Sequence, residues 1–427
     1  MPSDLPLDFS PVRDELTKYF RDNWDSIINS EIDGEKSKAA ELDRNNGRFG
    51  NLLAARKIAR VIFMGTAPIG KVSGVRGIEE NEIRLGTIQP ADVGSVSIFN
   101  DALSKLKENL YYLYSQDERL WFGVNPTLRK LVDDKRGQFS DGDIDYTIEQ
   151  RLKSWKGREK FKGVHLCPKN SGEVPDEQTA RLVILSPKYD GQKGIDAAQD
   201  ILENRGTVPR RWKNMLVFMA ADAGRLKELD AAVREYSAWR DVLKEDLNLD
   251  DIRRRDANNN LKSATMNFEM KVSQAYSKIL APYTDEKNVS EFHWNVGDIN
   301  CLNGENIFEA EKKFLSKELL LALMGEKALK RTLDNFIWRD RDSVDGDQLW
   351  EYFMTYCYLP RLVDRSALFA AINRGDQSKL FSLADNVLHK ELPIAQQPID
   401  DEPKAVEPAV NPDVEVERDV EIFIRVD

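Results

Sequence analysis

The chain has 427 residues, of which 41% are hydrophobic and 32% charged, and its net charge is −11. This length allows roughly two to four domains, and the acidic balance excludes a protein that binds nucleic acid through its overall charge, although a local basic face remains open. No stretch approaches the roughly 18–20 apolar residues of a membrane span, and the first residues lack the basic and apolar character of a signal peptide. The three cysteines lie far apart and are expected to be reduced thiols. We therefore expect a cytoplasmic protein with no membrane contact.

The first 68 residues predict helices that lead into one strand. Apolar residues at helical spacing predict an amphipathic helix over residues 10–30, with Ser10 and Pro11 at its start. Further helices are expected over residues 39–42 and 52–60. The apolar run Val61–Met64 then predicts a strand that ends in the turn 65–68.

The next segment predicts a helix, a hairpin and two more helices. Residues 97–111 have helical spacing, and residues 111–114 and 120–122 flank a polar turn. Asn125 and Pro126 precede a helix over residues 127–135, and a charged helix is expected over residues 141–160. This succession resembles parts of a winged-helix unit without fixing its order.

Residues 162–222 carry the strongest pattern in the chain. Three apolar runs, at 164–166, 180–185 and 214–219, are separated in part by residues with helical spacing. Continuous apolar runs that alternate with helices predict buried parallel strands. Because ligands bind at the carboxyl ends of such strands, we expect a site among the polar turn residues there.

The remainder is predicted to be largely helical. Helices are expected over residues 226–239, 251–281, 312–336 and 348–374, with an acidic loop over 340–347. Five prolines and many carboxylates between Pro393 and Pro412 predict a flexible linker. After it, Val420–Val426 alternates apolar and polar residues as a strand does.

The segment Gly65–Lys71 fits the spacing GxxxxGK of a phosphate-binding loop directly after the predicted strand. Val72 occupies the position at which a hydroxyl would bind Mg²⁺, and the glycine-rich residues after it are a poor helix start. We favour a strand-end turn over a nucleotide loop. Arg60 and Arg76 flank this turn within reach of a neighbouring phosphate, although surface arginines are the favoured interpretation.

Other candidate groups have simpler interpretations. Asp222 follows a strand as a Walker B carboxylate does, but a helix N-cap is favoured because a periodic helix begins at Leu226. His165 and Cys167 lack the further ligands of a zinc site. No nucleophile constellation is recognisable, and we assign no catalytic and no metal-binding residue.

A local basic face is the candidate nucleic-acid surface. It consists of Arg129, Lys130, Lys135 and Arg136 on one predicted helix. Phosphate binding by such a face is electrostatic and salt-dependent. Neighbouring aspartates dilute the charge, so a solvated helix face is the favoured alternative.

Short segments spread over residues 35–375 together resemble a known family. They are Ala54-Ala55-Arg56, Arg60 to Pro68, Arg76 to Glu79, Arg84-Leu85-Gly86, Tyr112-Leu113-Tyr114, Leu120-Trp121-Phe122, Pro126-Thr127-Leu128, Asn214 to Phe218 with Leu226 and Asp230, and Tyr356 to Leu362. The pattern resembles the carboxyl-terminal part of a large AAA+-superfamily ATPase family of unknown function. That family sits beside DNA methyltransferase genes in prokaryotic phage-defence loci and is similar to the phage-growth-limitation ATPases.

The resemblance implies specific roles. Val61–Pro68 would be a late strand of the ATPase core near the sensor position, with a sensor-like contact from Thr66 and an arginine-finger-like role for Arg76. Arg60 would be nucleotide-proximal. The Walker A sequence would lie before Met1, so ATP and Mg²⁺ belong to the intact family member and no cofactor is expected in this chain. The intact protein would be an oligomer.

The expected fold is mixed α/β and multidomain. Its parts are a tail of an AAA+-like core (1–95), a winged-helix-like unit (96–160), a small α/β domain (161–240), a helical segment (241–300), a helical domain (301–390), and an acidic proline-rich linker with a terminal strand (391–427). We expect a regulatory or substrate-engaging part of a defence-associated ATPase, inactive by itself, that acts on duplex DNA or on a partner such as a DNA methyltransferase. The alternative is a non-enzymatic scaffold for protein assembly.

Overall fold

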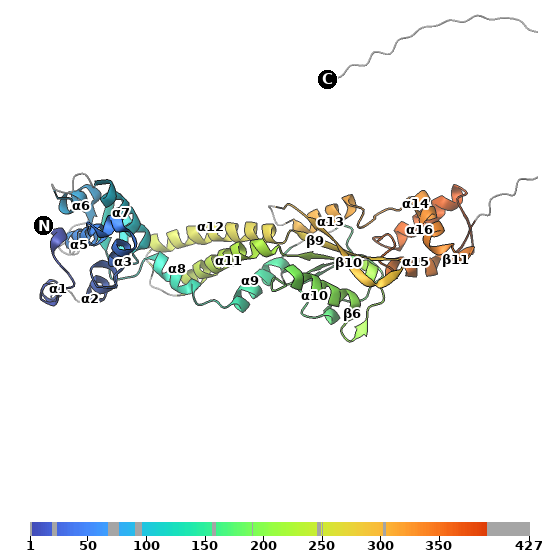
Figure 1. Cartoon of the computed structure of the whole chain (residues 1–427), viewed down its shortest axis with the longest axis horizontal. Coiled ribbons are helices and arrows are strands. Elements are labelled where there is room, and N and C mark those ends of the chain that lie inside the picture. Colours follow the sequence, from blue (N-terminus) through green and yellow to red (C-terminus); the bar gives the residue numbers. More distant parts are fainter. Residues whose placement is uncertain are drawn as a thin grey trace, which may run out of the picture.

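A computed structural model describes residues 2–18, 24–66, 77–89, 96–155, 159–189, 191–245, 249, 251–301 and 305–390, and the statements below concern these residues. The fold is mixed α/β. Figure 1 shows an elongated molecule with a helical unit at the amino-terminal end, a pair of long helices, a central sheet, and a second helical unit at the other end. Within these residues, no helix is both long and apolar enough to cross a bilayer.

The amino-terminal unit has one hydrophobic core, which extends from Leu7 to Phe122. Its three-stranded antiparallel sheet has the order β1-β3-β2. The predicted domain boundary at 95/96 passes through this core. The elements are η1 (Pro2–Asp4), α1 (Ser10–Thr17), α2 (Trp24–Ile27), η2 (Ile28–Ile32), α3 (Lys38–Asn45), α4 (Gly47–Gly50), α5 (Ala54–Thr66), β1 (Ile78–Glu79), α6 (Glu80–Thr87), α7 (Val96–Asn109), β2 (Leu113–Gln116) and β3 (Arg119–Phe122).

The strand predicted at Val61–Met64 is wrong, because these residues form the last part of helix α5. The helix is buried on most sides, so its apolar residues are consecutive and hide the helical period. The high helix propensity of Ala54, Ala55 and Ala59 favours the helix, but these residues lie before the run 61–64 that was interpreted as a strand. The predicted hairpin is confirmed as β2 and β3, and both of its turn residues, Asp117 and Glu118, have positive φ.

Two long helices join the amino-terminal unit to the sheet. α11 (Ala223–Lys244) and α12 (Asp251–Ala275) lie side by side, and α8 (Leu128–Arg136) packs against α11. Their shared core includes the small residues Ala238, Ala257 and Ala264, which let the helices approach closely. At 1.5 Å per residue, α12 is about 37 Å long.

The central sheet has five strands in the order β10-β9-β8-β5-β4. The predicted parallel strands are confirmed as β4 (Gly163–Leu166), β5 (Arg181–Ile184) and β8 (Leu216–Ala220). One face of the sheet packs on α10 (Gly191–Glu203), and the other packs on α9 (Asp141–Lys153), α12 and α13 (Asn306–Ser316). Shorter elements in this region are η4 (Ser171–Glu173), β6 (Asn204–Arg205), β7 (Val208–Pro209) and η5 (Lys213–Met215).

Strands β9 (Lys278–Asp285) and β10 (Asn288–Asp298) form an antiparallel hairpin that the sequence patterns did not predict. The helix predicted over residues 251–281 ends at Ala275 instead. The start of β9 is an apolar run directly after an amphipathic helix, and a short run of that kind fits a helix end equally well. Pairing of β9 with β8 decides in favour of a strand.

The carboxyl-terminal unit has its own core, which extends from Met324 to Leu388 and also takes in Met215. The helical blocks predicted over 312–336 and 348–374 are each divided, and the predicted acidic loop contains a strand. The elements are α14 (Glu326–Thr332), η6 (Leu333–Ile337), β11 (Ser343–Asp345), α15 (Gly346–Thr355), α16 (Arg365–Gln377), β12 (Ser382–Ala384) and β13 (Val387–His389). Arg361 connects this unit to the sheet, because its buried guanidinium donates hydrogen bonds to the carbonyls of Asn214 and Pro282.

Candidate functional site

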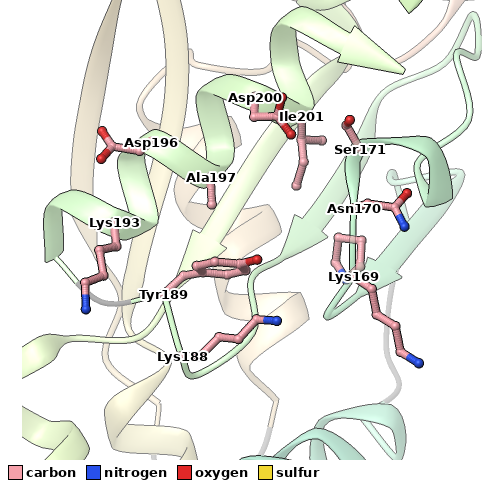
Figure 2. A pocket seen from close by; sticks show the side chains of 11 residues that line it. Lys169, Asn170, Ser171, Lys188, Tyr189, Lys193, Asp196, Ala197, Asp200 and Ile201 are labelled. Carbon is pink, nitrogen blue, oxygen red and sulfur yellow. The ribbon is translucent and has the colours of Figure 1, made fainter. Parts of the chain in front are cut away.

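A pocket of about 470 Å³ lies at the carboxyl ends of the parallel strands β4 and β5, where the sequence predicts a ligand site. Figure 2 shows that its lining comes from the loops after both strands and from helix α10. The lining residues are Pro168, Lys169, Asn170, Ser171, Lys188, Tyr189, Lys193, Asp196, Ala197, Asp200 and Ile201.

Local hydrogen bonds hold the two loops in place. After β4, the Asn170 side chain accepts a hydrogen bond from the Gly172 amide and starts the turn η4. After β5, the Ser186 hydroxyl donates to Glu149 of α9 at 2.8 Å, and the Tyr189 amide donates to the Ser186 carbonyl at 3.0 Å. The pocket therefore has a fixed frame, and its long lysine side chains are the adjustable part.

Three lysines and two aspartates line the pocket, so its positive charges exceed its negative charges by one. Among the described residues, none of Lys169, Lys188 and Lys193 has a carboxylate within 4 Å, and Lys188 lies over the Tyr189 ring at 5.0 Å from its centroid. The two lining carboxylates already have neutral partners, since Asp196 accepts from Gln192 and Asp200 accepts from Asn204. The arrangement suits an anion with an apolar part that contacts the tyrosine ring.

The buried groups behind the pocket do not supply a nucleophile. Burial raises the pKa of the Cys167 thiol to about 12, so this group stays protonated at neutral pH. The Tyr276 hydroxyl donates to the Leu185 carbonyl at 3.1 Å, and burial raises its pKa well above the usual value.

Arg60 is not the surface arginine that the sequence favoured. It is 8% exposed, and its guanidinium donates to both carboxylate oxygens of Asp33, at 2.6 and 2.8 Å, and to the Ser3 carbonyl at 3.1 Å. These bonds give the side chain a structural role within the amino-terminal core.

Thr66, the predicted sensor-like residue, joins α5 to the hairpin. Its hydroxyl donates to the Ile62 carbonyl at 2.7 Å and accepts from the Phe122 amide at 3.1 Å. The expectation that the segment Gly65–Lys71 follows a strand is wrong, because Gly65 and Thr66 are the last residues of a helix. The rest of that segment, from Ala67, and the predicted finger Arg76 lie outside the described residues.

The four predicted nucleic-acid contacts are on α8, and each is near a carboxylate. Arg129 is 3.9 Å from Asp133, and Lys130 pairs with Asp134. The other two pair with carboxylates in or next to α11. Arg136 lies 3.1 Å from Glu235 of α11, and Lys135 pairs with Glu245, the residue after this helix. These cations are partly neutralised, and two of them tie α8 to the long helix pair.

Two remaining candidates have structural roles. Asp222 caps α11, as the sequence favoured, by accepting a hydrogen bond from the Gly224 amide at 2.9 Å, and it lies 3.3 Å from the Lys278 ammonium. His165 lies beside Arg181 with 3.4 Å between their nitrogens. Among the residues with described positions, no group of three or more metal-binding side chains occurs.

The sequence patterns predicted the position of the pocket but missed its lysines. The three lysines, Lys169, Lys188 and Lys193, are spaced too irregularly to form a sequence motif. The sequence indicated them only by their positions, because each follows or faces the end of a predicted strand. A search of protein-family models, curated proteins and solved structures finds no match to this chain.

Proposed function

We propose that this chain is the carboxyl-terminal regulatory or substrate-engaging part of an AAA+-type ATP-binding protein of an anti-phage defence system, and that it acts through a DNA-modifying protein partner. One observation carries the proposal. The order of elements from α5 through β1, α6, α7, β2 and β3, with the sheet order β1-β3-β2, is similar to the order in a winged-helix unit and supports this assignment. We infer that the winged-helix-like unit expected over 96–160 corresponds instead to residues 54–122.

The charge of this unit favours a protein partner over duplex DNA. In a winged helix that binds DNA, the helix corresponding to α7 enters the major groove, and the hairpin turn contacts the backbone. The exposed side of α7 carries Lys105 and Lys107 together with Asp101 and Glu108, and the hairpin turn carries Asp117 and Glu118. Because acidic and basic side chains are mixed on this surface, binding to DNA would release few counterions and would gain little affinity from their release.

The elongated shape also supports a role in assembly. The long helix pair separates the amino-terminal unit from the carboxyl-terminal unit, so that two partners bound at the two ends would not collide. The scaffold alternative shares this feature with the main proposal. The two differ in whether an ATPase core is connected to the chain.

The choice between protein and DNA is tested by two binding measurements on the purified chain. Fluorescence anisotropy with a duplex oligonucleotide is measured at about 50 and 200 mM salt, a range over which phosphate-driven binding falls by orders of magnitude. Biolayer interferometry is measured with a DNA methyltransferase encoded beside such an ATPase. We expect saturable binding to the methyltransferase and none to DNA. Saturable, strongly salt-dependent DNA binding with no methyltransferase binding would overturn the proposal.

Nucleotide binding tests the assignment of ATP and Mg²⁺ to the intact family member. Fluorescent ATP with Mg²⁺ is titrated into the chain with and without duplex DNA. We expect no saturable binding. Micromolar binding would contradict this and would make Lys71→Ala the first variant to test.

A further inference from the structure

The edge of the central sheet at β10 has no partner strand among the described residues. β10 has 11 residues and pairs only with β9. Long edge strands attract other strands, and natural proteins usually protect them with lysine, proline or a covering segment. β10 contains neither lysine nor proline. Its register with β9 is interrupted between Asn288 and His293, so the regular part of this edge is His293 to Asp298.

The side chains of β10 continue the hydrophobic core to this edge. Phe292 and Trp294 are half-buried and pack on the core beneath α10. By the alternation of a strand, Val296 lies on the same face, and 57% of its surface is exposed. Val289, near the other end of the strand, is 44% exposed. An additional strand beside β10 would bury this apolar row.

The described chain ends close to the start of β10. The ammonium of Lys390, the last described residue, lies 3.4 Å from the Trp338 carbonyl. Arg339, the residue after Trp338, makes an ion pair at 2.6 Å with Glu286, which lies in the turn between β9 and β10. The point at which residue 391 begins is therefore only a few side-chain lengths from the edge strand.

The sequence after residue 390 contains a segment with the apolar and polar alternation of a strand, at a suitable distance along the chain. Residues 420–426 alternate, with Val420, Ile422, Ile424 and Val426 on one side. The 29 residues from 391 to 419 span about 30 Å as a flexible chain, from roughly 5–6 Å times the square root of 29. A segment tethered in this way is present at an effective concentration in the millimolar range.

We propose that residues 420–426 pair with β10 as a sixth strand of the central sheet. Main-chain hydrogen bonds to the open edge would supply affinity, and the isoleucines would cover the exposed side of Phe292 and Val296.

Hydrogen–deuterium exchange of the β10 amides tests this pairing. The full chain is compared with a chain that ends at Lys390, which retains every described element. We expect the exchange of amides within residues 288–298 to be at least about tenfold slower in the full chain, as for a paired strand. The double variant Ile422→Lys and Ile424→Lys should exchange like the shortened chain. The matched control, Val406→Lys with Val410→Lys in the linker, should keep the protection.

Two results would overturn the proposal. Equal exchange of β10 in the full and shortened chains would mean that the edge is not covered by the segment. Protection that rises with protein concentration, together with a dimer in light scattering, would place a second copy on the edge instead. In the expected outcome, the full chain is a monomer and a peptide of residues 413–427 restores protection to the shortened chain.

Discussion

At the scale of single residues, the buried arginines of this protein hold its parts together. Arg60 and Asp33 form a buried ion pair, and Asp33 also accepts from the Leu7 amide. Arg210 is likewise buried and donates to the carbonyls of Ile201 and Val174. Burial without such partners would be costly for a guanidinium, so these arginines are structural.

Replacement of Arg60 tests its structural role. Arg60→Ala leaves the Asp33 carboxylate buried without its cation, and we expect the free energy of unfolding of the amino-terminal unit to fall by about 3–5 kcal/mol. The control Arg48→Ala breaks an exposed pair with Asp101 and should cost about 0–1 kcal/mol. Urea denaturation followed by circular dichroism measures both. Equal losses in the two variants would refute the structural role.

The lysines of the pocket give a second prediction at this scale. Lys188→Glu with Lys193→Glu reverses two charges of the pocket, and we expect binding of inorganic pyrophosphate to weaken at least about tenfold. Isothermal titration calorimetry at low salt measures the affinity. The control Lys317→Glu changes an exposed lysine on another element and should leave the affinity unchanged. If the wild-type chain binds no pyrophosphate, the anion assignment of the pocket is wrong.

At the scale of elements, the junction between β8 and α11 depends on Asp222. Burial by itself would raise the pKa of this carboxyl, but the Lys278 ammonium and the amides of Gly224 and Arg225 outweigh it, and the pKa is lowered. A lowered carboxyl pKa means that the native state favours the charged form. The stabilisation is therefore present at neutral pH and is lost as pH falls through the ordinary aspartate range of about 4 and below.

Two variants of Asp222 separate its cap from its charge. Asp222→Asn keeps an acceptor for the Gly224 amide but loses the ion pair, so it should cost up to about 1 kcal/mol at pH 7 and less near pH 3, where the carboxyl begins to protonate. Asp222→Ala also loses the cap and should cost about 1 kcal/mol more at both pH values. Urea denaturation at the two pH values measures both effects. A cost of Asp222→Asn that does not change with pH would contradict the role of the charge.

At the scale of the whole molecule, the protein is extended because its cores are separate. The cores of the amino-terminal and carboxyl-terminal units share no residue. The helix pair between them packs into the core of the central sheet at one end and around Trp239 in a separate, smaller core. A compact chain of 390 residues would have a radius of gyration of about 21 Å. The arrangement in Figure 1 is far longer than it is wide.

Small-angle X-ray scattering of the chain that ends at Lys390 tests this shape. We expect a radius of gyration clearly above 21 Å and a distance distribution with a long tail. Calorimetry should show more than one unfolding transition, and Arg60→Ala should shift only the transition of the amino-terminal unit. A radius near 21 Å with a single transition would mean that the units fold onto one another.

The sequence by itself determined the parallel strands, the hairpin after α7, the cap at Asp222 and the position of a pocket at the strand ends. These features depend on patterns within a few neighbouring residues, which alternation, helical spacing and turn residues reveal directly. Only the tertiary structure decided that Val61–Met64 is helical, that residues 278–298 form two strands, and that Arg60 is buried. In each case a contact distant in the sequence made the decision: the packing of α5 within its core, the pairing of β9 with β8, and the ion pair with Asp33.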